Sequence, residues 1–256
     1  MSSLDNTDYI DAVEDVLQRT LELARGLTED DGRLPTGCPG WSVFDNIAHM
    51  VGLEQVLNGA PDPDIDLPPL DHVESDIDIY MEKQVHVRRE LPLVSVVDEL
   101  SGLIPRRIAS LREAAAMGDP LLPGPFGGRA MSKSLPVRIF DLWAHEQDIR
   151  RAVGLPVRDD CAAAEMSLER SILGWSRAIP AMAEGLDGVV RIECTGPDPS
   201  EVTVPIGQGG AELARIRGDL DSLTRTFCGR GDVDPSLLSG DPTLVERLSD
   251  NLNLTP

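Results

Sequence analysis

The sequence is poor in aromatic residues and has few histidines and cysteines. Only 4% of its 256 residues are Phe, Trp or Tyr, so a core must be built mainly from aliphatic side chains. The four cysteines are widely spaced and form no C-x-x-C pair, which excludes a zinc ribbon and argues against a disulfide framework. We therefore expect reduced thiols and a cytoplasmic location.

The chain also lacks a long apolar run and any excess of basic residues. No stretch approaches the roughly 18 apolar residues that span a bilayer, and the N-terminal segment MSSLDNTDYIDAVEDV is acidic, unlike a signal peptide. The 44 acidic residues outnumber the 23 Lys and Arg residues, giving a net charge of −21. Because such a surface repels phosphate backbones and anionic lipids, we expect neither nucleic acid nor a membrane as partner.

Apolar residues at helical spacing predict a series of helices through the first 185 residues. One of them follows the loop LPTGCPGW, and Ser42 with Asp45 three residues later forms a variant of the capping box at its start. Proline and glycine mark the breaks between helices. The predicted helices cover residues 7–27, 42–59, 72–91, 93–117, 134–153 and 160–184.

The composition changes near residue 186, where short β-branched segments replace the helical pattern. VVRIECT, EVTVPI and ELARIRG alternate in part between apolar and polar residues, as strands do. Two helices are predicted after them, over 219–228 and 241–252. The sequence therefore predicts an α+β protein of two domains, a helical domain of four main helices plus a bridging one over 1–185 and a small α+β domain over 186–256.

Asp141 and His145 lie four residues apart in a segment that is helical from end to end. Residues with this spacing share one face of a helix, so a carboxylate and an imidazole can coordinate the same divalent ion. His49 lies on another strongly apolar helix and is the candidate third ligand. Two histidines and a carboxylate, with one position open, are the ligand set of catalytic zinc. The alternative is that Asp141 pairs with His145 or a nearby arginine on a solvated face.

Several neighbours of these residues have two interpretations. Arg138 and Asp148 share the helix face of Asp141 and His145, where they either support the ligands or form a surface ion pair. Cys38 is close to His49 in sequence, and we interpret it as a loop residue rather than a nucleophile. The remaining histidines, His72 and His86, lack metal-ligand spacing and are expected on helix surfaces.

Two segments, PTGCPGWSVFDNIAHMVGLE and RIFDLWAHEQDIRRAVGLP, resemble the signature helices of the mycothiol-dependent maleylpyruvate isomerase family. The closing segments IRGDLDSLTRTFCGR and GDPTLVERLSDNLNLTP are similar to the small C-terminal domain found with them. The resemblance implies a DinB-like, up-and-down four-helix bundle followed by a small α+β domain. It also implies a zinc site, whose ligands fall on His49, Asp141 and His145, with Asp141 in place of the family's glutamate.

The resemblance further implies that mycothiol is the thiol cosubstrate and that its metal-bound thiolate attacks a small electrophile. Such an enzyme is an S-transferase or a cis–trans isomerase, and the aspartate at position 141 favours the more general description as a transferase. The resemblance also implies a functional arginine in the C-terminal domain. Arg230 is our candidate, alongside Arg138 in the helical domain; alternatively, Arg230 is a charge at a helix C-terminus.

Two other functions remain open from the sequence. A metal-dependent hydrolase would hold water at the open position of the same ion. A non-catalytic binding or regulatory module would keep the helices and the metal without the reaction. The sequence leaves the electrophile, the native metal and the oligomeric state undetermined.

Overall fold

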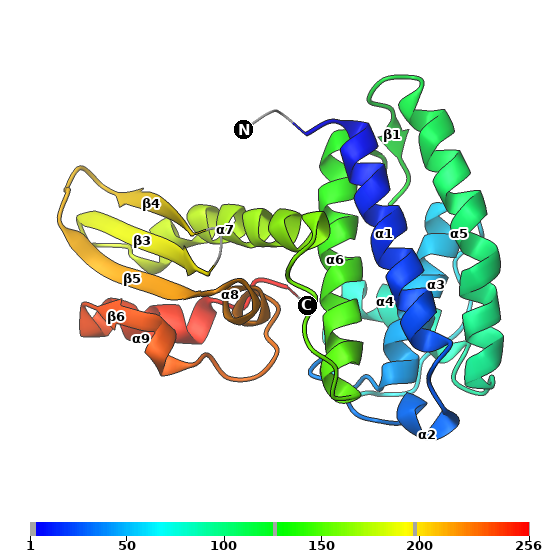
Figure 1. Ribbon diagram of the computed structural model, residues 1–256. Coiled ribbons are helices and arrows are strands. Elements are labelled where there is room, and N and C mark those ends of the chain that lie inside the picture. Colours follow the sequence, from blue (N-terminus) through cyan, green and yellow to red (C-terminus); the bar gives the residue numbers. More distant parts are fainter. Residues whose placement is uncertain (1–3, 125–126, 197–198, 256) are drawn as a thin grey trace. The chain divides into compact units, whose positions relative to one another are not determined.

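The computed structural model describes residues 4–124, 127–196 and 199–255 (Figure 1). It divides into two compact units, Met1–Val157 and Arg158–Pro256. The first unit is built almost entirely of helices, and the second combines helices with a four-stranded sheet. The mixed α and β composition predicted from the sequence is therefore confirmed.

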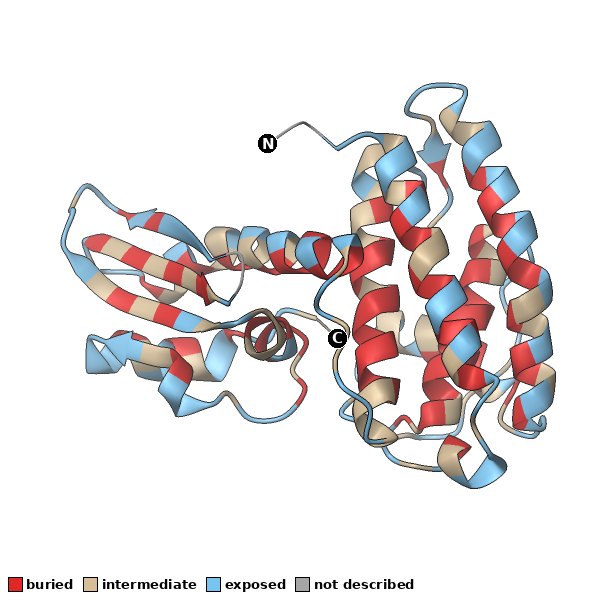
Figure 2. Cartoon of the chain, viewed as in Figure 1, coloured by how far each residue is buried: buried red, intermediate tan, exposed pale blue. Residues whose placement is uncertain are grey.

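The first unit is organised around four long helices with aliphatic inner faces. Helix α1 (Asn6–Ala24) packs against α5 (Leu93–Ala115) and α6 (Met131–Ala152), and α3 (Val43–Leu57) packs against the same two helices. Buried residues face the interior of this unit (Figure 2). That this arrangement is a DinB-like, up-and-down bundle stays a prediction. The shorter elements are α2 (Glu29–Gly32), α4 (Asp76–His86), β1 (Leu121–Leu122) and β2 (Arg129–Ala130).

Helix α3 begins where the sequence predicts it, at a capping box. The Ser42 hydroxyl accepts a hydrogen bond from the Asp45 amide at 3.2 Å, and the Asp45 carboxylate accepts one from the Ser42 amide at 2.9 Å. These bonds satisfy backbone groups that the first turn leaves without helical partners. They fix the start of the helix that carries His49.

Helix α6 begins earlier than predicted, at Met131 rather than Ser134. Asp119 takes the role of the cap, because its carboxylate accepts from both the amide and the hydroxyl of Ser132 at 2.7 Å. Pro136 consequently lies inside the helix. At the other end, Gly154 has a φ of 73°, which a glycine adopts without strain, and terminates the helix as predicted.

The second unit is built on one mixed sheet with the strand order β4-β3-β5-β6. Strand β3 is antiparallel to β4 and parallel to β5, and β6 is antiparallel to β5. Burial alternates along β3, which shows that one face of the sheet is covered (Figure 2). The elements are α7 (Ala162–Met182), β3 (Gly188–Thr195), β4 (Ser200–Ile206), β5 (Glu212–Asp219), α8 (Leu220–Phe227), β6 (Leu238–Gly240) and α9 (Pro242–Asn251).

Helix α7 belongs to a different unit from the one expected from the sequence. The sequence places it in the first domain, whereas in the structure it packs against α8, α9 and β4, so the units divide after Val157 instead of near residue 186. Trp175 explains this attachment: its side chain is fully buried, its indole nitrogen donates to the Leu252 carbonyl at 2.8 Å, and its ring contacts Phe227. A helical pattern alone does not reveal which partner a helix will have.

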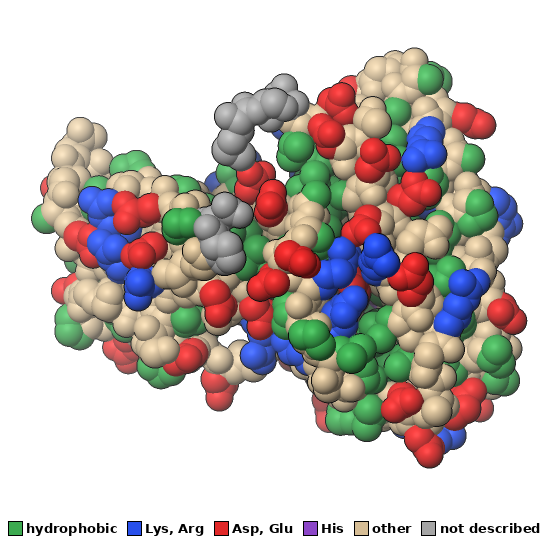
Figure 3. Space-filling view, in the orientation of Figure 1, with side chains coloured by type: hydrophobic (Ala, Val, Ile, Leu, Met, Phe, Trp, Pro, Cys, Tyr) green, Lys and Arg blue, Asp and Glu red, His purple; other side chains and the backbone are tan. Residues whose placement is uncertain are grey.

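Charged side chains of both signs lie on the outer face of the sheet (Figure 3). Ion pairs cross the strands there, for example between Arg215 and Glu193 at 2.7 Å and between Arg217 and Glu193 at 2.9 Å. Their charges offset one another locally, so this face is no general anion or cation surface. Among the described residues, no helix combines the length and the apolar character needed to cross a membrane.

Candidate metal centre

The three residues predicted as metal ligands lie together between α3 and α6. One donor atom from each of His49, Asp141 and His145 lies within 4.8 Å of the other two. The Nε2 atom of His49 is 3.2 Å from Asp141 Oδ2, and Nε2 of His145 is 3.8 Å from Asp141 Oδ1. We call this cluster the His49 site. The packing of α3 against α6 brings together residues that are far apart in the sequence.

The three side chains of the His49 site differ in exposure. Both histidines are buried, whereas the Asp141 side chain is 24% exposed. Burial lowers the pKa of His49 to about 4, which leaves its ring neutral at pH 7 and able to donate a lone pair. Burial alone would raise the pKa of Asp141, but Arg138 and the two histidines hold it well below its usual range. The His49 ring is therefore neutral and the Asp141 carboxylate ionised, as metal binding requires.

Asn46 fixes the orientation of His145. Its Nδ2 group donates to Thr36 Oγ1 at 3.1 Å and to the Ser42 carbonyl at 2.8 Å, so its Oδ1 atom points the other way as an acceptor. The Nδ1–H group of His145 donates to this Oδ1 atom at 2.6 Å. Since Nδ1 carries the proton, the lone pair of His145 lies on Nε2, which faces Asp141. Sequence reasoning missed Asn46, although its position three residues before His49 on the same helix face was a usable signal.

Trp41 covers both imidazoles. Its ring centroid is 4.8 Å from that of His49 and 5.5 Å from that of His145. The indole nitrogen donates to Glu82 at 2.9 Å, and this buried carboxylate also accepts from Arg89. A large apolar ring held in this way shields the two histidines from water.

His72 also bonds to Glu82, which corrects one expectation from the sequence. It lies in a turn before α4 rather than on a helix surface, and its Nε2 atom is 3.1 Å from Glu82 Oε2. Gly40, with a φ of 74°, makes room for it, because a Cβ atom there would lie 2.2 Å from His72 Nδ1. His86, in contrast, ends α4 and is half-buried. The loop before α3 is therefore packed tightly behind Trp41.

Arg138 links the His49 site to a buried ion-pair network. Its Nη1 atom donates to Asp141 Oδ2 at 2.6 Å, and its Nε atom donates to Glu54 at 2.9 Å. Arg107 donates to the other oxygen of Glu54, whose side chain is fully buried. Burial would raise the pKa of Glu54, but the two arginines hold it below its usual range. Arg138 therefore contacts the predicted ligand Asp141 directly.

Arg230, the second candidate arginine, belongs to the second unit. It is buried, and its Nη1 atom donates to the Cys228 carbonyl at 2.8 Å. Cys228 is the C-cap of α8, so this contact is the helix C-terminal role that the sequence offered as the alternative. A catalytic role for Arg230 stays a prediction.

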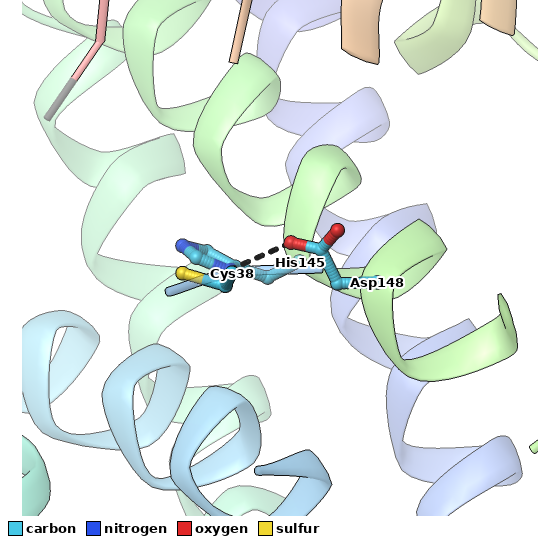
Figure 4. Close-up of side chains that lie close together, drawn as sticks. All are labelled: Cys38, His145 and Asp148. Carbon is cyan, nitrogen blue, oxygen red and sulfur yellow. Dashed lines mark ion pairs between the residues drawn. The ribbon is translucent and has the colours of Figure 1, made fainter. Parts of the chain in front are cut away.

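Cys38 lies in a loop, as predicted, but the loop brings it close to His145. One donor atom each from Cys38, His145 and Asp148 lies within 4.8 Å of the other two (Figure 4). The loop is directed there by Thr36, whose hydroxyl oxygen accepts from the Cys38 amide at 3.2 Å and from Asn46 at 3.1 Å. No spacing in the sequence indicates this approach, because it depends on the path of an irregular loop.

Comparisons with known proteins relate the sequence and the fold of this chain to one family. Over residues 13–150, more than half of the chain, the sequence matches the family model "Mycothiol maleylpyruvate isomerase N-terminal domain". The fold is similar to crystal structures of the mycothiol-dependent maleylpyruvate isomerase and of a histidine-to-alanine mutant of it. Both structures have a TM-score of 0.59 and 14% sequence identity to this chain. The match to the isomerase covers 90% of this chain and 91% of the isomerase chain. The match to the mutant covers 89% of this chain and 90% of the mutant chain. A search of curated proteins finds no match. By its sequence match, the chain belongs to the mycothiol maleylpyruvate isomerase N-terminal domain family.

Proposed function

We propose that the protein is a zinc-dependent enzyme that uses mycothiol as cosubstrate to attack a small electrophile. The observation that carries this proposal is that one donor atom from each of His49, Asp141 and His145 lies within 4.8 Å of the other two. The family match supports the thiol, because the family is named for a mycothiol-dependent isomerase. The solved structures with a similar fold carry the same name.

The residues of the His49 site fit a catalytic zinc ion. Two neutral imidazoles and one carboxylate are a typical ligand set for it, and they leave a coordination position for an exogenous ligand. Asn46 holds His145 in the tautomer that directs a lone pair toward Asp141. When bound, zinc supplies the positive charge that keeps a thiol in its thiolate form at neutral pH.

The charges around Asp141 favour an anionic exogenous ligand on the ion. The positive charges of Arg107 and Arg138 already offset the negative charges of Glu54 and Asp141. A divalent ion in this largely buried site therefore favours an anionic exogenous ligand that balances part of its charge. A thiolate meets this requirement, but so does the hydroxide that a hydrolase would form from bound water, so the thiol is supported by the family match rather than by charge.

The protein side chains have separate tasks in this proposal. His49, Asp141 and His145 hold the ion, Arg138 orients the Asp141 carboxylate, and Trp41 excludes water from the imidazoles. Thiol addition followed by release of the adduct makes an S-transferase, whereas rotation and elimination of the thiol make a cis–trans isomerase. We prefer the transferase because Asp141 replaces the glutamate of the isomerase pattern. Arg230 remains a candidate for binding anionic groups of either reactant.

The proposal is tested by thiol binding to cobalt-substituted protein. The Cys38→Ser variant is used as the background, so that any thiolate-to-cobalt charge-transfer absorption arises from added thiol. We expect this absorption to appear when mycothiol is added and to be absent after His145→Ala substitution. Cobalt-loaded protein that shows no such absorption with mycothiol would overturn the proposal and favour the hydrolase or the non-catalytic module.

A further inference from the structure

The two nitrogen atoms of His145 face different groups of metal-binding side chains. Its Nε2 atom lies 3.8 Å from Asp141 Oδ1, in the His49 site. Its Nδ1 atom lies 3.6 Å from Asp148 Oδ2 and 2.6 Å from Asn46 Oδ1. Cys38 adds a sulfur atom to the second group (Figure 4).

The second group is well placed to hold an ion of its own. One donor atom from each of Cys38, His145 and Asp148 lies within 4.8 Å of the others, a spread similar to that of the His49 site. His145 and Asp148 are buried, and Cys38 is half-buried.

We propose that Cys38, His145 and Asp148 form a second metal position, the Cys38 site, which binds a thiophilic divalent ion and competes with the His49 site for His145. The donors are a thiolate sulfur, an imidazole nitrogen and a carboxylate oxygen, and Asn46 Oδ1 is available as a fourth, neutral oxygen. A thiolate ligand raises the affinity for a soft ion such as cadmium more than that for zinc, which is borderline. The His49 site offers no sulfur, so the two positions differ in metal preference.

The two sites compete because a neutral His145 imidazole can serve only one of them at a time. A neutral imidazole carries one lone pair, on either Nε2 or Nδ1. Binding at the Cys38 site moves the ring proton from Nδ1 to Nε2 and releases the Cys38 thiol proton to solvent. Asn46 Oδ1 then loses a hydrogen-bond donor and gains the cation as its partner. A thiophilic ion at the Cys38 site consequently removes His145 from the His49 site and releases the ion held there.

Metal binding at the Cys38 site requires neither mycothiol nor an electrophile, whereas its competition with the His49 site rests on the zinc site of the proposed function. Its test uses cadmium and the metal-free full-length protein without added thiol. We expect thiolate-to-cadmium charge-transfer absorption in the wild type and after His49→Ala substitution, because His49 is outside the Cys38 site. The absorption should be lost in Cys38→Ser, with Cys161→Ser as the matched control that retains it.

The competition supplies a second readout. Cadmium added to zinc-loaded wild type should release the zinc, whereas zinc should resist displacement more strongly in Cys38→Ser. Cys38→Ala serves as a second variant if the serine substitution impairs folding, which circular dichroism checks. Absence of sulfur absorption in the wild type would overturn the proposal. Loss of the absorption in both Cys38→Ser and His49→Ala would also overturn it, by showing that both residues bind the same ion.

Discussion

Replacing Asn46 by leucine should weaken zinc binding without altering any residue of the His49 site. Asn46 is fully buried and makes three side-chain hydrogen bonds, one to His145 Nδ1 at 2.6 Å, one to Thr36 and one to the Ser42 carbonyl. Leucine has a similar branched shape, although it is larger, and it accepts no hydrogen bond. The Nδ1–H group of His145 would then lose the partner that fixes its tautomer.

The size of the effect follows from this lost acceptor. Removing such an outer partner of a metal-bound histidine typically weakens metal affinity by about 10–100-fold. Because each tenfold change corresponds to about 1.4 kcal/mol, this loss is about 1.4–2.8 kcal/mol of binding free energy. A buried N–H group left without an acceptor costs about 1–3 kcal/mol, which is the same range.

Competition with a chromophoric chelator measures the zinc affinity, and Asn46→Asp is the matched control. Aspartate keeps an acceptor for His145 but loses the two donated bonds, so this variant should keep most of the affinity while its free energy of unfolding falls. The reasoning is refuted if a folded Asn46→Leu variant binds zinc as tightly as the wild type. Equal affinity losses in both variants would likewise show that the acceptor is not what matters.

Three further substitutions test other parts of the structure. Glu54→Ala should lower the free energy of unfolding by about 3–5 kcal/mol in urea titrations, because it leaves the buried Arg107 and Arg138 without their carboxylate partner. As a control, Arg112→Ala at an exposed ion pair should change this free energy by less than about 1 kcal/mol. Equal changes in the two variants would contradict the argument. Cys38→Ser should keep its zinc by elemental analysis, since sulfur is no part of the His49 site; loss of zinc from the folded variant would make Cys38 a ligand there. Gly40→Ala should destabilise the protein by about 1 kcal/mol or more and shift its tryptophan emission. The φ of 74° strains a residue with a side chain, and a Cβ atom would collide with His72. Unchanged emission and stability would contradict this packing.

The helices α3 and α6, and the proximity of His49, Asp141 and His145, could be predicted because local sequence patterns encode them. Helical periodicity and the Ser42–Asp45 capping box define α3, and the four-residue spacing of Asp141 and His145 puts them on one face of α6. Since both helices are apolar around much of their circumference, each had to be buried against other helices. The juxtaposition of His49 with the pair then required only that α3 and α6 pack together.

The features that the sequence did not reveal depend on contacts across irregular segments or between distant elements. The approach of Cys38 to His145 follows from the path of the loop before α3, which Thr36 holds by side-chain hydrogen bonds. The attachment of α7 to the second unit depends on Trp175 and its contact with the Leu252 carbonyl, far away in the sequence. Strand β6 has only three residues, too few to show an alternating pattern.

Zinc content in ligand variants tests the central claim most directly. We expect about one zinc ion per chain in the wild type after zinc loading and dialysis, because the His49 site has the ligand set of a single catalytic ion. His49→Ala and His145→Ala should each lose this zinc in elemental analysis while circular dichroism shows unchanged helix content. Folded variants that both retain the full zinc content of the wild type would contradict the assignment of the His49 site.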